Sequence, residues 1–342
     1  MATPPAKPGR LRVPARAART DKALASLRVL SLTGGGYRGI FTGEVLVQLC
    51  RATKCEGSLE DVFDVFAGTS IGGLIACALA VGVTPRSVLQ TIEKHGRQVF
   101  PPKKNRTLRR AFFGTLYDSH HLEDAIDECL GSSKDLKLKD LEKGLVVPAV
   151  DWVNGCTRIF VSGFMGKAYA TDATLRELCL ATSAAPTYFK PKVVDGSPML
   201  DGGLSMNNPD VLALTEVARR WPERLAQLEM LSIGTAGADS PRDAASAEKA
   251  GLGWAKLLPE YMMVVQERTA SAQATRVLGS RYLRVNHSDD HDAAFLNLDV
   301  ADDRARFKLL DAASIAAKAA YLSHRTFIDR MLNRHLSKPV VS

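Results

Sequence analysis

Short apolar runs and glycine-rich turns alternate along the first part of the chain. The run 27–33 ends at consecutive glycines, and after it apolar residues recur at helical spacing to about residue 52. A second apolar run, 61–66, is also followed by glycine and then by the small, apolar, helix-forming segment 74–81. Two strand–turn–helix units in succession predict a layered α/β architecture with a largely parallel central sheet.

The rest of the chain is more helical. A hairpin is predicted around Asn154-Gly155, a frequent turn dipeptide. Neither a repeat nor a linker interrupts 27–337, so we expect one domain whose C-terminal part is helical. The same patterns predict helix over most of 84–131, with a break at Pro101-Pro102, and over 172–183; strands at 145–150, 158–162 and 228–234; a tight turn at 200–204; and, from about 244, chiefly helix with one strand near 282–285.

The first 26 residues have a different composition. They hold six Lys and Arg against one Asp, four prolines and no aromatic residue. This composition is typical of a disordered basic arm, and no apolar segment follows that would make it a secretory signal. The longest apolar run, 74–83, spans ten residues, whereas a transmembrane helix needs about 20. We therefore expect a cytoplasmic protein without a membrane span.

Positive charge is concentrated in two short segments. The chain has 45 Lys and Arg against 37 Asp and Glu, a formal net charge of +8. The arm 1–26 carries +5 and the segment 103–110 another +5, so the other residues sum to −2. This distribution favours an anionic membrane surface or a small anionic nucleotide over DNA, for which no recognition motif is present. A solvated loop is the alternative interpretation of 103–110.

Gly68-Thr-Ser70-Ile-Gly72 fits the pattern G-x-S-x-G between a predicted strand and a predicted helix. In a nucleophile elbow the two glycines relieve crowding at a sharp turn, and the serine is raised to an exposed point at the start of the helix. The pattern is common by chance, but the strand before it and the small-residue helix after it favour the elbow. Ser70 is therefore the candidate nucleophile.

A second glycine turn, Gly34-Gly35-Gly36-Tyr-Arg38-Gly, has two interpretations. As G-x-G-x-x-G it satisfies a dinucleotide fingerprint, which also needs an acidic residue at the end of a following strand. As an oxyanion hole, it would direct backbone N–H groups at an oxygen that becomes negative during acyl transfer. The neighbouring Ser70 turn favours the oxyanion hole. Arg38 would add positive charge there, or form a surface salt bridge.

A serine nucleophile needs a base. None of the seven histidines lies in a convincing sequence setting, and His95, His324 and His335 are expected to face solvent from helices. Asp201, on the tight turn Asp201-Gly-Gly, is the candidate base, with an ordinary turn aspartate as the alternative. The six cysteines show no CxxC pair and no zinc spacing, so they are interpreted as reduced thiols and no metal site is predicted.

These motifs, in this order, resemble the patatin-like phospholipase family. The resemblance extends over about residues 27–285 and includes Leu116-Tyr-Asp-Ser, Leu122-Glu-Asp-Ala, Ala181-Thr-Ser-Ala-Ala-Pro-Thr-Tyr-Phe189, Asp201-Gly-Gly-Leu-Ser-Met-Asn-Asn-Pro209 and Leu231-Ser-Ile-Gly-Thr235. It implies a three-layer α/β/α fold and a Ser–Asp dyad that hydrolyses acyl esters of lipids. By position, Ser70 would be the nucleophile, Asp201 the base, and Gly34, Gly35, Gly36 and Arg38 the oxyanion region, without a metal or other cofactor.

The loop departs from the usual family pattern at one residue. The family opens it with Asp, where this chain has Thr33, a change expected to alter loop support and not the chemistry. Leu32-Thr-Gly-Gly-Gly-Tyr-Arg-Gly39 resembles the bacterial branch that acts in anti-phage signalling. That resemblance implies activation by a cyclic dinucleotide such as cyclic GMP–AMP, and degradation of membrane phospholipids at the inner face of the cell membrane.

Two features leave alternatives open. The apolar segment 257–265 is interpreted as a core helix, with a cover over the site or the face of a homo-oligomer as alternatives. For the whole chain, the leading hypothesis is a lipid acyl hydrolase gated by a nucleotide. A constitutive lipase or esterase, and a non-catalytic nucleotide-binding α/β protein that retains the glycines, are the alternatives.

Overall fold

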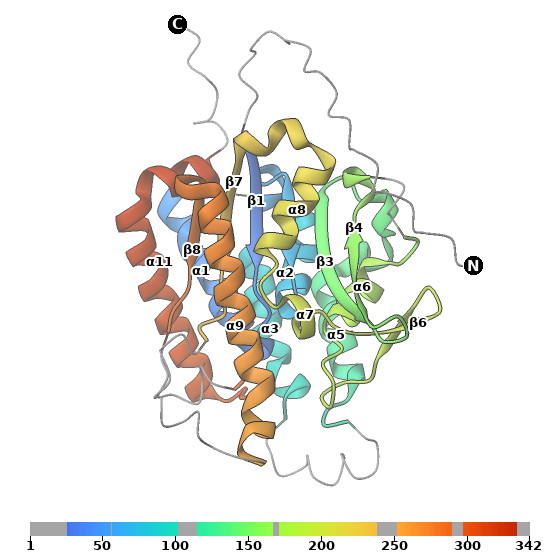
Figure 1. The fold of residues 1–342 in the computed structure, drawn as a ribbon. Helices are drawn as coiled ribbons and strands as arrows, with labels where there is room; N and C mark the ends of the chain where they lie inside the picture. Colours follow the sequence, from blue (N-terminus) through green and yellow to red (C-terminus); the bar gives the residue numbers. More distant parts are fainter. Residues whose placement is uncertain are drawn as a thin grey trace, which may run out of the picture.

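The computed structural model describes residues 26–55, 57–101, 115–166, 171–237, 252–288 and 297–333. An eight-stranded sheet forms their centre, in the order β5-β6-β3-β2-β1-β7-β8 with β4 paired to β3 (Figure 1). The strands are β1 (Leu27–Leu32), β2 (Val65–Gly68), β3 (Gly144–Asp151), β4 (Cys156–Val161), β5 (Lys192–Val194), β6 (Ser197–Asp201), β7 (Leu228–Ile233) and β8 (Tyr282–Val285).

The pairing confirms the expected largely parallel sheet. Strands β1, β2, β3, β7 and β8 all run in the same direction. Strands β3 and β4 form the hairpin expected around Asn154-Gly155, and β6 is antiparallel to the second half of β3. The hairpin turn is closed by the Asp151 carboxylate, which accepts hydrogen bonds from the backbone N–H groups of Val153 and Asn154.

Helices cover both faces of the sheet, giving the three layers of the expected α/β/α fold. Side chains alternate along β1, so Leu30 and Leu32 join one apolar core while Leu27 and Val29 join the other. Figure 1 shows α7, α8 and α9 in front of the sheet, α2 behind it, and α11 at one edge beside α1. The helices are α1 (Gly39–Thr53), α2 (Ile71–Ala80), α3 (Pro85–Val99), α5 (Ser119–Leu130), α6 (Leu175–Thr182), α7 (Gly203–Met206), α8 (Asp210–Arg220), α9 (Leu252–Leu278) and α11 (Asp303–Leu332).

One predicted strand begins later than its apolar pattern suggests. The pattern starts at Asp61, whereas residues 59–61 form a short 3-10 turn and β2 begins at Val65. The Ser58 hydroxyl accepts a hydrogen bond from the Glu60 N–H and caps that turn. The Asp64 carboxylate then accepts the N–H of Arg28, the second residue of β1. Local polar contacts therefore override the apolar run until Val65.

Some sequence features lie outside the described residues: positions 1–25 of the basic arm and the basic segment 103–110. Among the helices that are described, none is both long and apolar enough to cross a lipid bilayer. All six cysteines lie in the described part and form no disulfide, and Cys77 and Cys179 are buried on α2 and α6.

Candidate active site

The loops that follow the parallel strands meet at one edge of the sheet. β1 leads into the glycine loop at Gly34, β2 leads into Ser70, and β7 leads into Thr235. Parallel strands place their carboxyl ends together, and the crevice outside those ends is the usual ligand site of an open α/β sheet. The two glycine motifs of the sequence are therefore brought together by the fold.

Ser70 occupies a sharp strand-to-helix turn, as expected for a nucleophile elbow. Its backbone has φ 54° and ψ −126°, a conformation that a non-glycine residue adopts only under strong constraint. The constraint includes a hydrogen bond of 3.0 Å from the Ser70 N–H to Oγ1 of Thr182. A side chain at Gly68 would overlap the Gly72 carbonyl, and one at Gly72 would overlap the Leu32 carbonyl. Glycine at both positions is therefore a steric requirement of the turn.

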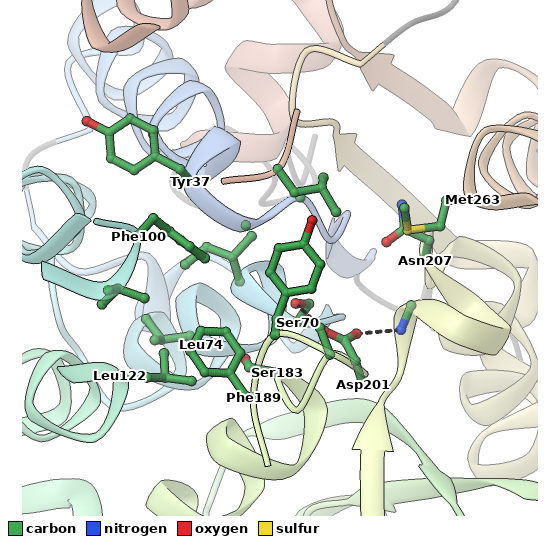
Figure 2. Close-up of a pocket in the computed structure, with 18 of the residues that line it drawn as sticks. Tyr37, Ser70, Leu74, Phe100, Leu122, Ser183, Phe189, Asp201, Asn207 and Met263 are labelled. Atoms are coloured by element: carbon green, nitrogen blue, oxygen red, sulfur yellow. Dashed lines mark hydrogen bonds between the residues drawn. The ribbon is translucent and has the colours of Figure 1, made fainter. Parts of the chain in front are cut away.

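The serine hydroxyl is hydrogen-bonded to Asp201. Oγ of Ser70 donates to Oδ2 of Asp201 at 2.8 Å, and the Gly203 N–H donates to the other carboxylate oxygen at 2.7 Å. Figure 2 shows the two side chains next to each other among the residues that line the cavity. Burial raises the pKa of Asp201 from 3.8 to about 6, although both hydrogen bonds act in the opposite direction. A carboxyl group with this pKa can accept a proton near neutral pH and release it again.

The glycine loop presents two backbone N–H groups to the same cavity. Gly35 and Gly36 line it together with Ser70, and within the described residues neither of their N–H groups donates a hydrogen bond. The N–H of Gly34, by contrast, donates to the Asn207 carbonyl at 3.0 Å. Gly34 therefore shapes the loop in this structure, while Gly35 and Gly36 have N–H groups available for an oxyanion.

Arg38 lies outside the cavity. Its side chain is buried, and its guanidinium group is next to Gly237 instead of the space above Ser70. The positive charge of Arg38 therefore does not line the cavity, and the glycine loop separates it from Ser70.

An apolar cavity of about 640 Å³ opens beside the dyad. In Figure 2 Leu74, Phe100, Leu122 and Phe189 gather on one side of Ser70 and Asp201, and Met263 lies on the other. The large apolar and aromatic residues that line the cavity are Tyr37, Ile71, Leu74, Ile92, Val99, Phe100, Leu122, Tyr188, Phe189, Leu204, Met262, Met263 and Leu298. A cavity of this size and composition suits a hydrocarbon chain.

Two sequence expectations about this cavity are wrong. His95 does not face solvent: it is buried, lines the cavity, and places Nε2 2.8 Å from a carboxylate oxygen of Glu128 on α5. The segment 257–265 is not core in its C-terminal half, where the alternative interpretation, a cover over the site, agrees with the structure. Tyr261, Met262 and Val265 are between 39% and 49% exposed, and Met262 and Met263 line the cavity. In both cases the exposure of the side chains depends on a helix distant in the sequence: α5 for His95, and α7 for α9.

A polar network lies behind the glycine loop and includes Thr33, the residue that the sequence indicated would alter loop support. The Thr33 hydroxyl accepts a hydrogen bond of 2.9 Å from Arg284 on β8, and Arg284 also forms an ion pair with Glu267 on α9. The Thr33 side chain is buried and supports the loop from below. The network links the glycine loop to α9, which carries Met262 and Met263.

Three further residues position the site; each lies within a stretch that carries the family resemblance, but the sequence assigned none of them a role. Thr182 accepts from the Ser70 N–H and donates to the Pro148 carbonyl at 2.7 Å. Asn207 accepts from Gly34, and Thr235 donates to the Gly34 carbonyl at 3.2 Å. Thr182 and Thr235 lie at the ends of elements that the sequence predicts, whereas Asn207 follows the short helix α7, which it does not. Within the described ranges, no group of three or more His, Cys, Asp or Glu side chains could hold a metal ion.

The chain is similar to known phospholipases. The family model described as patatin-like phospholipase matches residues 30–214. The chain is 30% identical to a "cGAMP-activated phospholipase" of Vibrio cholerae serotype O1, over 88% of this chain and 91% of the relative. It is 33% identical to a protein of the same name from Escherichia coli, over 62% of this chain and 63% of that relative. A third relative of that name, from Pseudomonas aeruginosa, is 29% identical over 86% and 85%.

Proposed function

The chain belongs to the patatin-like phospholipase family, and we propose that it hydrolyses fatty-acyl esters of membrane phospholipids with Ser70 as nucleophile and Asp201 as base. The observation that carries the proposal is the 2.8 Å hydrogen bond between the two side chains at the wall of an apolar cavity. A serine held in an elbow, with a proton acceptor at hydrogen-bond distance, is the arrangement that activates it.

The reaction proceeds in two halves. Oγ of Ser70 attacks the ester carbonyl carbon while Asp201 takes the hydroxyl proton, and the N–H groups of Gly35 and Gly36 hold the oxyanion. Asp201 returns the proton to the departing alcohol, which leaves an acyl group on Ser70. Water then attacks the acyl-enzyme and gives a proton to Asp201. Asp201 passes that proton to Oγ of Ser70 as the acyl–oxygen bond breaks, so the fatty acid is released and the serine hydroxyl is restored.

The rim of the cavity supports a membrane substrate. Leu204 and Met262 line the cavity and are also 45% and 49% exposed, so they stand at its mouth. An apolar rim allows an acyl chain to pass from a bilayer to the cavity without crossing water. We expect the reaction to occur at the inner face of the cell membrane, with the basic segment 103–110 attracting anionic headgroups.

We further propose that a cyclic dinucleotide activates the enzyme. The support is that three relatives, two of them similar over more than four fifths of this chain, carry the name cGAMP-activated phospholipase. The resemblance of the 32–39 segment to that branch points the same way.

A labelling experiment tests the dyad and the gating separately. The purified chain is treated with a fluorophosphonate probe, with and without each member of a cyclic dinucleotide panel, and fatty acid release from phospholipid vesicles is measured in parallel. Ser70→Ala should abolish labelling, and both Ser70→Ala and Asp201→Asn should lower fatty acid release by about 10³-fold or more. The exposed residues Ser132 and Asp135 offer matched controls, Ser132→Ala and Asp135→Asn, which should behave as wild type.

The outcomes separate the alternatives. Labelling of Ser70 only when a cyclic dinucleotide is present supports a gated phospholipase. Labelling and release that are independent of nucleotide would point to a constitutive lipase or esterase. Nucleotide binding without labelling under any condition would leave a non-catalytic binding protein.

A further inference from the structure

The outer face of α11 carries an exposed apolar stripe. Phe307, Ile315 and Leu322 are 68%, 56% and 73% exposed. At 3.6 residues per turn these three positions fall within an arc of about 80°. Figure 1 shows α11 at the edge of the molecule with α1 on its inner side, and small buried residues such as Ala313 and Ala317 face that side. The active site is elsewhere, so its chemistry does not account for the stripe.

Two opposite charges lie inside the same arc. Asp311 and Lys318 are exposed, and each falls between two of the apolar positions. They are seven residues apart, about 10 Å along the axis, so they are too distant to pair within one helix. Within the described part of the chain, neither of them forms an ion pair.

The order of these residues is self-complementary. When two copies of the helix lie antiparallel about a two-fold axis between residues 314 and 315, Phe307 faces Leu322 of the second copy. In the same register Asp311 faces Lys318, and the two Ile315 side chains meet at the axis. An isologous contact makes each pair twice, so one register satisfies both charges of both copies.

The ends of the stripe limit this register. Arg304 and Arg325 would face each other as like charges beyond Phe307 and Leu322. Arg325, however, lies past the break in helical geometry at His324 and forms an ion pair with Asp329 at 3.5 Å. The complementary part of α11 is therefore the straight segment 307–322.

We propose that this α11 stripe, residues 307–322, is the interface of a homodimer in which two copies pack antiparallel about a two-fold axis. The stripe combines three large exposed apolar side chains with two opposite charges that pair when a reversed copy lies against it. The inference does not depend on the catalytic role of Ser70.

Charge reversal tests the register. Sedimentation velocity at low salt measures the dimer dissociation constant of the full chain. Asp311→Lys and Lys318→Asp should each weaken the dimer about tenfold, because two attractive pairs become repulsive. The double variant Asp311→Lys/Lys318→Asp should recover the wild-type constant. Ile315→Lys should weaken the dimer at least tenfold, while the matched control Ser323→Lys, exposed but outside the arc, should leave it unchanged.

Far-UV circular dichroism and the thermal midpoint confirm that each variant is folded, which is expected for exposed positions. A wild-type chain that stays monomeric at all concentrations would overturn the proposal, as would a dimer that Ile315→Lys does not weaken. Failure of the double variant to recover would overturn the antiparallel register. If instead the chain is monomeric and Ile315→Lys releases it from anionic phospholipid vesicles, the stripe is a lipid-binding surface and the dimer proposal is wrong.

Discussion

The two walls of the cavity are built in different ways. On the sheet side, Ser70 and Asp201 are fixed by backbone geometry and by hydrogen bonds from Gly203 and to Thr182. On the other side, Met262 and Met263 reach the cavity from α9, a helix whose neighbouring side chains are partly exposed. The reacting groups of the first wall are held by hydrogen bonds, whereas the second wall is apolar and partly exposed to solvent.

The difference follows from what each wall does in the proposed reaction. Acyl transfer depends on the position of a few atoms, and a displacement of about 1 Å can cost a hundredfold in rate. Binding a hydrocarbon chain depends mainly on apolar area, for which unbranched methionine side chains adapt well. The wall that holds the reacting atoms should therefore tolerate few substitutions, and the α9 wall many.

Among substitutions outside Ser70 and Asp201, Gly72→Ala should give the largest effect. The added methyl group would overlap the carbonyl oxygens of Leu32 and Thr33, so the elbow must shift. We expect the free energy of unfolding to fall by about 2–4 kcal/mol and the rate of ester hydrolysis to fall more than 100-fold. Chemical denaturation and fatty acid release measure the two effects.

Gly43→Ala is the matched control for that substitution. Gly43 is buried within α1, where the three atoms nearest to an added methyl group all belong to Leu89, Cβ and Cδ1 at 3.3 Å and Cα at 3.5 Å. Alanine also favours a helix interior, so stability should stay within about 1 kcal/mol of wild type. Equal losses in both variants would mean that tight packing, and not the elbow, explains the Gly72 effect.

The wall on the sheet side, which holds Ser70 and Asp201, is also the easier one to predict from sequence. Glycine spacing reports backbone geometry directly, so Gly68, Ser70 and Gly72 could be placed on a strand-to-helix turn. The Asp201-Gly-Gly turn could be recognised, but not its distance from Ser70, because 131 residues separate the two. That distance depends on the antiparallel pairing of β6 with β3, which the motifs do not encode.

The apolar pattern of α9 leaves a core helix and a cover over the site both open, and it cannot choose between them. An apolar helical segment fits a core helix as well as a cavity wall, and only the position of α9 against α7 distinguishes them. That position depends on polar contacts such as Gln266 Nε2 to the Leu204 carbonyl at 3.1 Å, and on the Glu267–Arg284 ion pair. His95 was misplaced for a similar reason, since Glu128 lies on another helix.

Asp201→Asn should stabilise the folded protein at neutral pH. The pKa of Asp201 is about 6 in the folded protein, against an ordinary value of 3.8, so burying the ionised form costs about 3 kcal/mol above pH 6. Below about pH 4 the carboxyl is protonated in both states and the cost is absent. The thermal midpoint of Asp201→Asn relative to wild type should therefore rise between pH 4 and pH 7.

The exposed residue Asp135 provides the control for this measurement, because Asp135→Asn changes the same group without burial. Its thermal midpoint should follow that of wild type at every pH. If Asp201→Asn is no more stable than wild type at pH 7, burial of the ionised Asp201 carboxyl does not destabilise the folded protein.

The pH dependence of hydrolysis should reflect the same carboxyl group. Asp201 must be ionised to accept the Ser70 proton, so kcat/KM should rise with pH and level off above about 6. One pH unit below that value the rate should be about tenfold lower. Short-chain esters in solution are the suitable substrate, since they avoid the pH dependence of a lipid surface. A flat profile between pH 5 and pH 7 would exclude Asp201 as the base.

Met263→Ala should give the smallest effect, because it changes only the cavity wall formed by α9. Removing this side chain widens the cavity opposite Ser70 without touching the dyad or the glycine loop. We expect a two- to fivefold change in KM, in favour of bulkier acyl chains, with little change in kcat. Met263→Leu conserves volume and should behave as wild type. A fall in kcat comparable to that of Gly72→Ala would mean that α9 holds the reacting atoms as tightly as the sheet does, and the contrast between the two walls would no longer hold.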